Sequence, residues 1–499
     1  MLIVLLLAQA VLLFGGFAIL SSKIIVIEYL AAILSVFVLM YIMNGRLDSD
    51  FKLMWIILIL AVPVVGVILY LYTRVQLGTI RIKNRIADID SIQHSYREQN
   101  QDAMSKIIDE YEYEQGLFNY LERKAEYPVY DKASVKYFPL GEDKFRELVQ
   151  QLERAEEFIF LEYFIIDFGY MWDTIREILV RKAKEGVEVR LMYDGTNSLS
   201  LLPLSYPKRL QEQGINCKVF SPMRPFLQTH QNNRDHRKIA VIDGRVAFTG
   251  GINLADEYIN EKERFGHWKD VAIMVEGDAV NSFTLMFLQM WDVDSESCTD
   301  YSKYLRFGHL PELGMRNGGY IVPYGDSPMD DVLTGETVYL DIINRSTKYV
   351  HIMTPYLILD EELIDSMCYA AHRGVDVKLI LPHIPDKKYA YILARTYYKE
   401  LVREGVEIYE YTPGFVHAKV FTSDDIKGVV GTINLDFRSL YLHFECAAYL
   451  FRNPVIYDIE EDFQETLKKC QQITLGDCER YSKLKLTAGS LLRLVAPLM

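Results

Sequence analysis

The chain has 499 residues, of which half are hydrophobic, and a formal net charge of −14. This length is sufficient for two ordinary domains together with a membrane segment. The acidic balance excludes a general electrostatic attraction to nucleic acid, so we expect no nucleic-acid partner. The six cysteines are scattered, without a CxxC pair or a Cys/His cluster, which argues against a zinc site and favours a reduced, intracellular catalytic region.

Three apolar segments open the chain and predict membrane helices. They cover residues 2–20, 24–43 and 55–72, and Glu28 is the only charged residue within them. Each segment is about long enough to cross the hydrocarbon layer as a helix. Because a very short linker joins the first two segments, the sequence is compatible with either two or three spans. We therefore expect a transmembrane region over residues 1–75.

Charges beyond the third apolar segment predict its orientation. Arg74, Arg81, Lys83 and Arg85 follow it, and no acidic residue occurs before Asp88. By the positive-inside rule, the remainder of the chain lies in the cytoplasm. The same basic cluster would contact anionic membrane lipids, although a solvated juxtamembrane helix explains it equally well.

Residues 76–128 are polar and predict a helical linker, after which an internal repeat begins. GVEVRLMYDG at residue 186 matches GVDVKLILPH at residue 374, and GGINL at residue 250 matches GTINL at residue 431. Strand-like and helical patterns alternate in the same order in both copies, as in a sheet flanked by helices. We predict one duplicated α/β domain, with a first copy over residues 129–310 and a second over residues 311–499. The predicted strands cover residues 158–166, 187–193, 215–220 and 236–242, then 350–354, 375–381, 406–411 and 417–421, and the predicted helices cover residues 172–185 and 360–372.

Two copies of a His-x-Lys-x4-Asp sequence occupy equivalent places in the two repeats. On a strand, residues two apart face the same side, so each copy presents an imidazole and an ammonium group toward a common point. One such pair carries little information, whereas two pairs with identical spacing in a repeat are hard to attribute to chance. The first copy is formed by His236, Lys238 and Asp243, and the second by His417, Lys419 and Asp424.

The residue types in these motifs suit chemistry at phosphorus. One imidazole can attack the phosphorus atom while the other protonates the leaving oxygen. Asn253 and Asn434 follow the motifs, with Ser439 after the second, and together with the two lysines they suit the non-bridging oxygens. Asp243 and Asp424 belong to the catalytic candidates, although a structural role in the turn after each strand is favoured. Because no carboxylate cluster for magnesium accompanies the motifs, we predict a metal-free mechanism without a cofactor.

An attacking imidazole needs its second ring nitrogen held by a hydrogen-bond acceptor. Asp270 lies 34 residues after His236, and Glu445 lies 28 residues after His417, each at the start of a strand-like segment. We predict that each carboxylate orients the histidine of its own repeat. The alternative is a surface carboxylate at the end of a strand.

The motifs resemble those of the phospholipase D superfamily and, more narrowly, of bacterial cardiolipin synthases. The resemblance covers nearly the whole chain. It implies two tandem phospholipase D-like α/β domains, each with a mixed sheet flanked by helices, that form one pseudo-twofold active site behind transmembrane helices. The phrases that carry it are NNRDHRKIAVIDG from residue 232, GGINLADEY from 250, GTINLDFRSLYLHFE from 431, TPYLILDEEL from 354, AAHRGVDVKLILP from 370 and WIILILAVPVVGVILYL from 55.

The resemblance also implies a reaction. One phosphatidylglycerol would transfer its phosphatidyl group to a histidine and release glycerol, and the terminal hydroxyl of a second phosphatidylglycerol would then attack to give cardiolipin. By similarity His236 is the nucleophile and His417 the general acid and base, and an exchange of these roles stays open. The expected location is a bacterial cell membrane crossed more than once, with the catalytic domains on the cytoplasmic side. The oligomeric state is left open, with a homodimer as one alternative.

Competing interpretations remain at this point. The same site would serve a hydrolytic phospholipase D, another phosphatidyltransferase or a nuclease, and the acidic balance argues against the nuclease. A non-enzymatic membrane scaffold would be expected to have lost one of the paired histidines or lysines. Residues 484–499 would either lie on the membrane as an amphipathic segment or pack over the catalytic domain, and packing is favoured.

Overall fold

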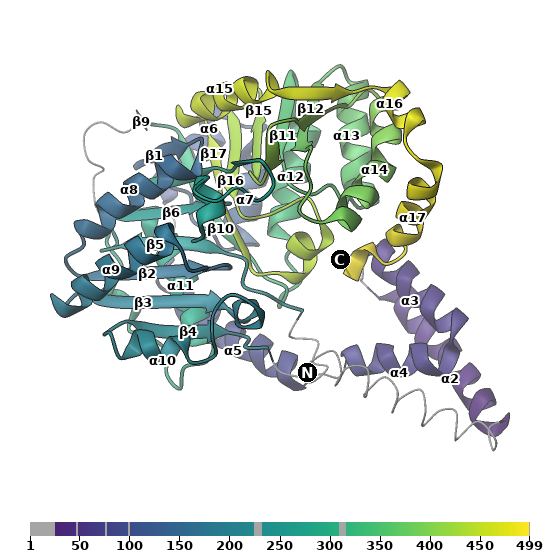
Figure 1. Ribbon diagram of the computed structural model, residues 1–499, viewed down its shortest axis with the longest axis horizontal. Coiled ribbons are helices and arrows are strands. Elements are labelled where there is room, and N and C mark those ends of the chain that lie inside the picture. The colour runs from purple at the N-terminus through teal and green to yellow at the C-terminus, as the bar shows by residue number, and fades with distance from the viewer. Residues whose placement is uncertain are drawn as a thin grey trace.

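The computed structural model describes residues 25–45, 48–74, 77–97, 100–223, 232–308 and 316–498. The predicted apolar segment at residues 2–20 and the predicted domain junction at residues 310 and 311 lie outside these ranges. Figure 1 shows two sheet-containing halves side by side, the first in teal and the second in green and yellow, with three N-terminal helices extending away from them.

The first half is built on a mixed eight-stranded sheet with the order β4-β3-β2-β5-β6-β8-β1-β9. Its β2, β3 and β4 are parallel, and the other neighbours are antiparallel. Every residue of β2 is buried, as expected for a strand covered on both faces. The strands are β1 (Ala133–Phe138), β2 (Phe158–Tyr163), β3 (Glu188–Asp194), β4 (Asn216–Phe220), β5 (Lys238–Ile242), β6 (Val246–Gly250), β8 (Ala272–Gly277) and β9 (Arg316–Asn317).

The second half repeats this plan in the order β10-β17-β16-β15-β11-β12-β13-β18. Here β11, β12 and β13 are the parallel strands, so the prediction of two mixed α/β sheets is confirmed. A short parallel pair, β7 (His267–Lys269) with β14 (Gly414–Val416), joins the halves. The strands of the second sheet are β10 (Tyr320–Asp326), β11 (Tyr349–Met353), β12 (Asp376–Pro382), β13 (Glu407–Tyr411), β15 (Val420–Ser423), β16 (Lys427–Gly431), β17 (Glu445–Phe451) and β18 (Cys470–Ile473).

Helices cover the outer face of each sheet, and two further helices lie between the sheets. The outer helices pack on their own sheet and form one apolar cluster in each half. The two inner helices share a third cluster with residues of both sheets, so the halves are fused through a common core. The outer helices are α8 (Gly141–Glu153), α9 (Tyr170–Lys184), α10 (Tyr206–Gln211), α12 (Thr334–Arg345), α13 (Glu361–His372) and α14 (Lys388–Arg403), and the inner ones are α11 (Val280–Asp292) and α15 (Val455–Leu467).

Local sequence explains why these helices form where they do, and α9 is an example. Trp172, Ile175 and Leu179 recur at helical spacing and are fully buried against the sheet. At the start of the helix, the Asp256 carboxylate accepts a hydrogen bond from the Met171 N–H at 2.8 Å. This negative charge lies at the positive end of the helix dipole and stabilises the helix.

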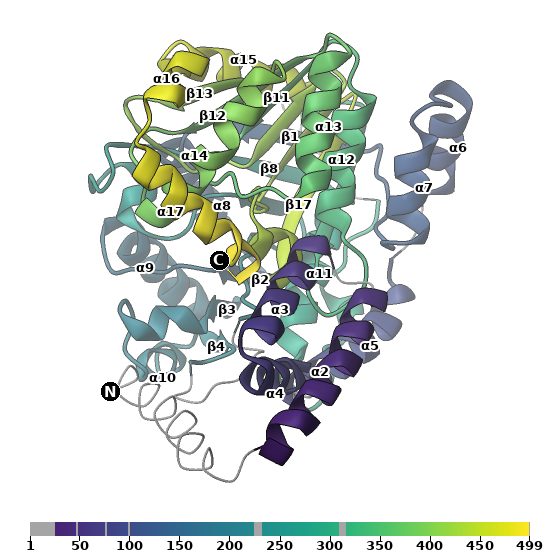
Figure 2. The same ribbon diagram turned by 90° about the vertical axis from the view of Figure 1, so that its right-hand side faces the viewer.

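The N-terminal region contains α2 (Ile25–Asn44), α3 (Ser49–Ala61) and α4 (Pro63–Arg74). The prediction of one continuous helix over residues 55–72 is wrong, because the helix is interrupted at Val62, directly before Pro63. Proline lacks an N–H donor and disfavours helical backbone at the preceding residue. Within the described parts of the chain, no helix combines the length and the apolar character needed to cross a membrane. Figure 2 shows these helices below the second half.

Helices near both ends of the described chain contact the two sheet-containing halves. The α3 residue Phe51 packs its ring against Tyr441 at a centroid distance of 5.6 Å. Residues 76–128 contain α5 (Leu77–His94), α6 (Gln101–Glu110) and α7 (Gln115–Arg123), and α6 and α7 add residues to the core of the second half. The C-terminal α17 (Lys483–Arg493) packs along α14, as favoured from the sequence.

Candidate active site

The backbone at each motif histidine is bound to the opposite half of the molecule. The N–H of His236 donates to the carbonyl of Phe444 at 2.9 Å, and the N–H of His417 donates to the carbonyl of Lys269 at 2.7 Å. These bonds place the two histidines in equivalent positions on either side of the interface between the halves.

The strands that follow the two histidines begin later than predicted. Strand β5 begins at Lys238 and strand β15 at Val420, so both histidines precede the strands assigned to them. The predicted strands at residues 236–242 and 417–421 therefore begin too early. At the histidines the chain pairs with the backbone of the other half, and it enters its own sheet only afterwards.

Each histidine is held by a buried carboxylate. The Nδ1 atom of His236 lies 2.8 Å and 3.0 Å from the two carboxylate oxygens of Glu445. The Nδ1 atom of His417 lies 2.7 Å from Oδ2 of Asp270. Both carboxylates are completely buried.

The predicted pairing of carboxylates and histidines is wrong, because the pairs are crossed. Glu445 contacts the histidine of the first repeat, and Asp270 contacts the histidine of the second. The cause is the backbone pairing across the halves, which brings the segment before β17 next to His236 and β7 next to His417. One site is thus assembled from interlocked parts of both repeats.

The motif lysines are buried beside the histidines. The Nζ atom of Lys238 donates to the carbonyl of His236 at 2.6 Å, and Lys419 donates in the same way to the carbonyl of His417. Burial lowers the pKa of Lys238 to about 8 and that of Lys419 to about 7, although Asp270 and Glu445 oppose this shift. Each ammonium group retains further N–H donors that can bind an anionic ligand.

Electrostatics link the two motifs into one centre. Burial, and after it the charges of Lys238 and Lys419, hold the pKa of His236 well below its usual value. Burial and the same two lysines lower the pKa of His417 in the same way. Both imidazoles are therefore uncharged at neutral pH. With Nδ1 donating to a carboxylate, the Nε2 lone pair of each ring is available for reaction.

The two motif asparagines occupy matching positions. Asn253 donates to the Tyr258 hydroxyl at 2.8 Å and accepts from the N–H of Ile165 at 2.9 Å. Asn434 donates to the Ser439 hydroxyl at 3.0 Å. Each amide retains a second N–H, so a contact with phosphate stays a prediction for both.

The motif aspartates lie away from the imidazoles, in the turns after β5 and β15. The Asp243 carboxylate accepts hydrogen bonds from the N–H groups of residues 156, 157 and 158, at 2.9, 2.7 and 2.8 Å. Asp424 accepts in the same way from the N–H groups of residues 347, 348 and 349. Both residues have a positive φ, of 54° and 57°, which aspartate tolerates better than most residues. This geometry corresponds to the structural role favoured from the sequence.

Replacement of Asp243 by Ala should therefore lower the stability of the fold rather than the rate of the reaction. Three N–H groups, that of the buried Phe158 among them, would lose a charged acceptor, so we expect the free energy of unfolding to fall by about 2–4 kcal/mol. The turnover number per folded molecule should stay near that of the wild type. Denaturant unfolding and turnover measured on the same preparation check this, and a large loss of turnover at unchanged stability would contradict it.

One pair of residues near the histidines was not singled out from the sequence. The ring centroid of His443 lies 5.6 Å from that of His236, and the ring of Trp268 lies 5.4 Å from that of His417. His443 precedes Glu445 by two residues, and Trp268 precedes Asp270 by two residues. This shared spacing is the signal in the sequence that could have identified them. His443, His236 and Glu445 also place one potential ligand atom each within 4.8 Å of one another.

Comparisons with known proteins agree with this architecture. The family model described as cardiolipin synthase, PLD-like domain, matches residues 148–291 and 339–467, and a phospholipase D-nuclease N-terminal model matches residues 33–74. An uncharacterized protein of Streptococcus mutans is 49% identical over 92% of this chain and 99% of that protein. Cardiolipin synthases of Alkalihalophilus pseudofirmus and Halalkalibacterium halodurans are 33% and 32% identical, each over 90% of this chain and 88% of the relative.

A solved structure supports the fold independently. The phosphatidylserine synthase of Haemophilus influenzae matches with a TM-score of 0.58 and 12% identity, over 73% of this chain and 95% of that chain. At this identity the match concerns the fold alone. The extent of the family match and the identity to the named relatives decide membership. The chain belongs to the cardiolipin synthase family of the phospholipase D superfamily, with two phospholipase D-like domains.

Proposed function

We propose that this protein is a cardiolipin synthase, which transfers a phosphatidyl group from one phosphatidylglycerol to another and releases glycerol. The observation that carries the proposal is the pair of imidazoles, each held at Nδ1 by a buried carboxylate of the other half. The relatives of similar length that are named cardiolipin synthases support this choice of reaction.

In the first step, Nε2 of His236 attacks the phosphorus atom of the donor lipid. The bond between phosphorus and the oxygen of the headgroup glycerol breaks, and His417 donates a proton to that oxygen. The bound anionic phosphodiester raises the pKa of His417 and so favours its protonated form. Glu445 stabilises the positive charge that develops on His236 during the attack. Lys238 and Lys419 bind the non-bridging oxygens.

In the second step, neutral His417 takes a proton from the terminal hydroxyl of a second phosphatidylglycerol. The hydroxyl oxygen attacks phosphorus, the bond from phosphorus to nitrogen breaks, and His236 is regenerated. One phosphodiester replaces another over the whole cycle, so the transfer is reversible and needs no external energy source. The same histidine serves as acid and then as base.

Hydrolysis is the competing outcome on this site, because water in place of the lipid hydroxyl would give phosphatidic acid. Purified protein supplied with phosphatidylglycerol as the only lipid discriminates between the two. Cardiolipin and glycerol in equal amounts are expected. Phosphatidic acid without cardiolipin would refute the proposal and identify a phospholipase D-type hydrolase.

The pH dependence of kcat/KM should show a loss at alkaline pH. The pKa values of Lys419, about 7, and Lys238, about 8, apply to the free enzyme, so rising pH removes the charges that bind phosphate. Because bound phosphate raises both pKa values, the corresponding loss in kcat should begin at higher pH. Rates in mixed micelles at limiting and at saturating phosphatidylglycerol measure the two profiles. A value of kcat/KM that stays constant beyond pH 8 would contradict this assignment.

We further propose that the protein associates with the bacterial cell membrane through its N-terminal helices, with the catalytic halves on the cytoplasmic side. Phe37 in α2 and Leu60 in α3 are each 65% exposed, which is unusual for large apolar side chains. The contact between Phe51 and Tyr441 holds α3 against the segment that carries Ser439 and His443. A lipid held by these helices would therefore lie near the site.

A further inference from the structure

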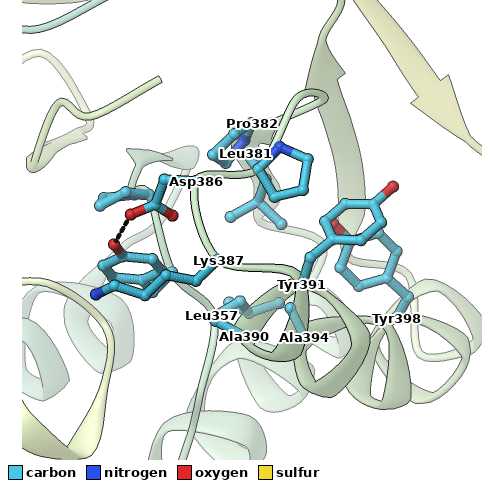
Figure 3. Close-up of a pocket in the computed structure, with 12 residues that line it drawn as sticks. Leu357, Leu381, Pro382, Asp386, Lys387, Ala390, Tyr391, Ala394 and Tyr398 are labelled. Atoms are coloured by element: carbon cyan, nitrogen blue, oxygen red, sulfur yellow. Dashed lines mark hydrogen bonds between the residues drawn. The ribbon is translucent and has the colours of Figure 1, made fainter. Parts of the chain in front are cut away.

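A pocket opens beside the reaction centre, at the start of α14. About 20 Å³ of its space is open to a molecule of the size of water. Residues that follow β11, the end of β12 with the segment after it, and the first three turns of α14 form its wall. Figure 3 shows the lining residues, with Lys387 near Asp386. The carboxylate of Asp386 accepts a hydrogen bond from Tyr356. Most of the wall is apolar, and Asp386 and Lys387 are the charged groups in its lining.

The wall of this pocket is paired through its backbone with the loop that carries Asn434. Leu357 in the wall pairs with Leu435, the residue after Asn434. The N–H of Ile358 donates to the carbonyl of Leu435 at 2.9 Å. The position of the pocket relative to the site is therefore fixed by backbone pairing.

Lys387 is held at the rim of this pocket by its neighbours. Its Nζ atom lies 4.7 Å from the centroid of the Tyr356 ring, a cation–π distance. The Tyr356 hydroxyl donates to Oδ2 of Asp386 at 2.6 Å, which fixes the ring. Lys387 is exposed, so its ammonium group can bind an anion from solution or from a lipid headgroup.

The charge of Lys387 reaches the reaction centre. It is among the charges, after burial and the motif lysines, that lower the pKa of both His236 and His417. It lies outside both His-x-Lys-x4-Asp motifs. At the matching place in the first half, the segment after β3 is Gly195–Leu199, which contains no lysine. Within the described residues, the segment after β3 thus offers no counterpart of Lys387 in the first half.

The proposed reaction requires a second phosphate site. The acceptor phosphatidylglycerol brings its own phosphodiester, joined to the attacking hydroxyl through a single glycerol. Lys238 and Lys419 serve the phosphate that reacts, so the acceptor phosphate needs donors of its own, and a cation is the strongest of these. Lys387 belongs to the second half, as does His417, the proposed base for the acceptor hydroxyl.

We propose that Lys387, supported by Tyr356, binds the phosphate of the acceptor phosphatidylglycerol and so selects a phospholipid as the acceptor. Oδ1 of Asp386 has no hydrogen-bond partner among the described residues, and it suits the free hydroxyl of the bridging glycerol. This inference rests on the proposed function and concerns one part of its substrate.

Two reactions of the same enzyme distinguish the proposed acceptor site from the residues that both reactions need. Cardiolipin formation uses an acceptor with a phosphate, whereas exchange of labelled glycerol into phosphatidylglycerol uses an acceptor without one. Lys387→Ala should lower kcat/KM for cardiolipin formation about 10-fold to 100-fold, the effect of losing one charge-assisted contact. Glycerol exchange should be affected much less, because glycerol brings no phosphate. Lys387→Arg should retain most of the activity, and Lys388→Ala, at the adjacent exposed lysine, should change neither reaction.

Two results would overturn the acceptor site. An equal loss in both reactions would place Lys387 on the shared phosphate or in the general fold. Unchanged cardiolipin formation would show that Lys387 binds no acceptor. Failure of the proposed function gives a different signature, because the wild-type protein itself would then form no cardiolipin, and the acceptor assignment would be refuted with it.

Discussion

Replacement of His236 or His417 by Ala is expected to reduce cardiolipin formation by about 10³-fold to 10⁵-fold. The first substitution removes the attacking nitrogen, and the second removes the proton donor and acceptor. Because the two imidazoles act on one phosphorus atom, the double variant should be hardly slower than either single variant. Cardiolipin formation from phosphatidylglycerol in micelles measures all three.

His372→Ala is the matched control for these histidine variants. His372 is exposed and has its own carboxylate partner, Glu404, at 2.8 Å, but it lies outside the site. The control should leave the rate unchanged. Losses that multiply in the double variant would mean that the histidines act independently, in two separate sites.

The second large effect is expected from the crossed carboxylates. Glu445→Gln and Asp270→Asn should each lower kcat by about 10²-fold to 10⁴-fold. Each removes a buried negative charge that orients an imidazole and stabilises its protonated form. The unfolding temperature should change much less than the rate, because the amide side chains are almost the same size as the carboxylates.

The crossing itself is tested by the nitrogen resonances of labelled histidine. Glu445→Gln should shift the ring resonances of His236, and Asp270→Asn should shift those of His417. Glu460→Gln is the matched control, because Glu460 holds His351 at 2.9 Å outside the site. A shift of His417 in the Glu445 variant, with His236 unchanged, would restore pairing within each repeat and refute the crossing.

The duplication and the reacting groups could be predicted from sequence because both depend on local patterns. The matching phrases and the identical His-x-Lys-x4-Asp spacing identify two equivalent units, and alternating β-rich and helical patterns identify their strands. The importance of Asp270 and Glu445 also follows from position within the repeat. These features need no knowledge of how the two units face each other.

The remaining features depend on contacts between segments that are distant in sequence. The partner of each carboxylate is set by backbone pairing between the halves, which spacing within one repeat cannot show. Lys387 lies at the end of the connection between β12 and α14, which carries no motif. The break before Pro63 does not follow from the apolar pattern, because neighbouring helices can satisfy the backbone groups that a proline frees within a membrane helix.

The central claim is that His236 and His417 flank one phosphorus atom, and counting the covalent intermediate tests it most directly. Enzyme mixed with phosphatidylglycerol labelled at phosphorus is quenched during turnover, and the labelled peptides are mapped and quantified. We predict at most one label per chain, on His236. Label on His417 instead would exchange the two roles within the same site. Two labels per chain, one on each histidine, would contradict the single site.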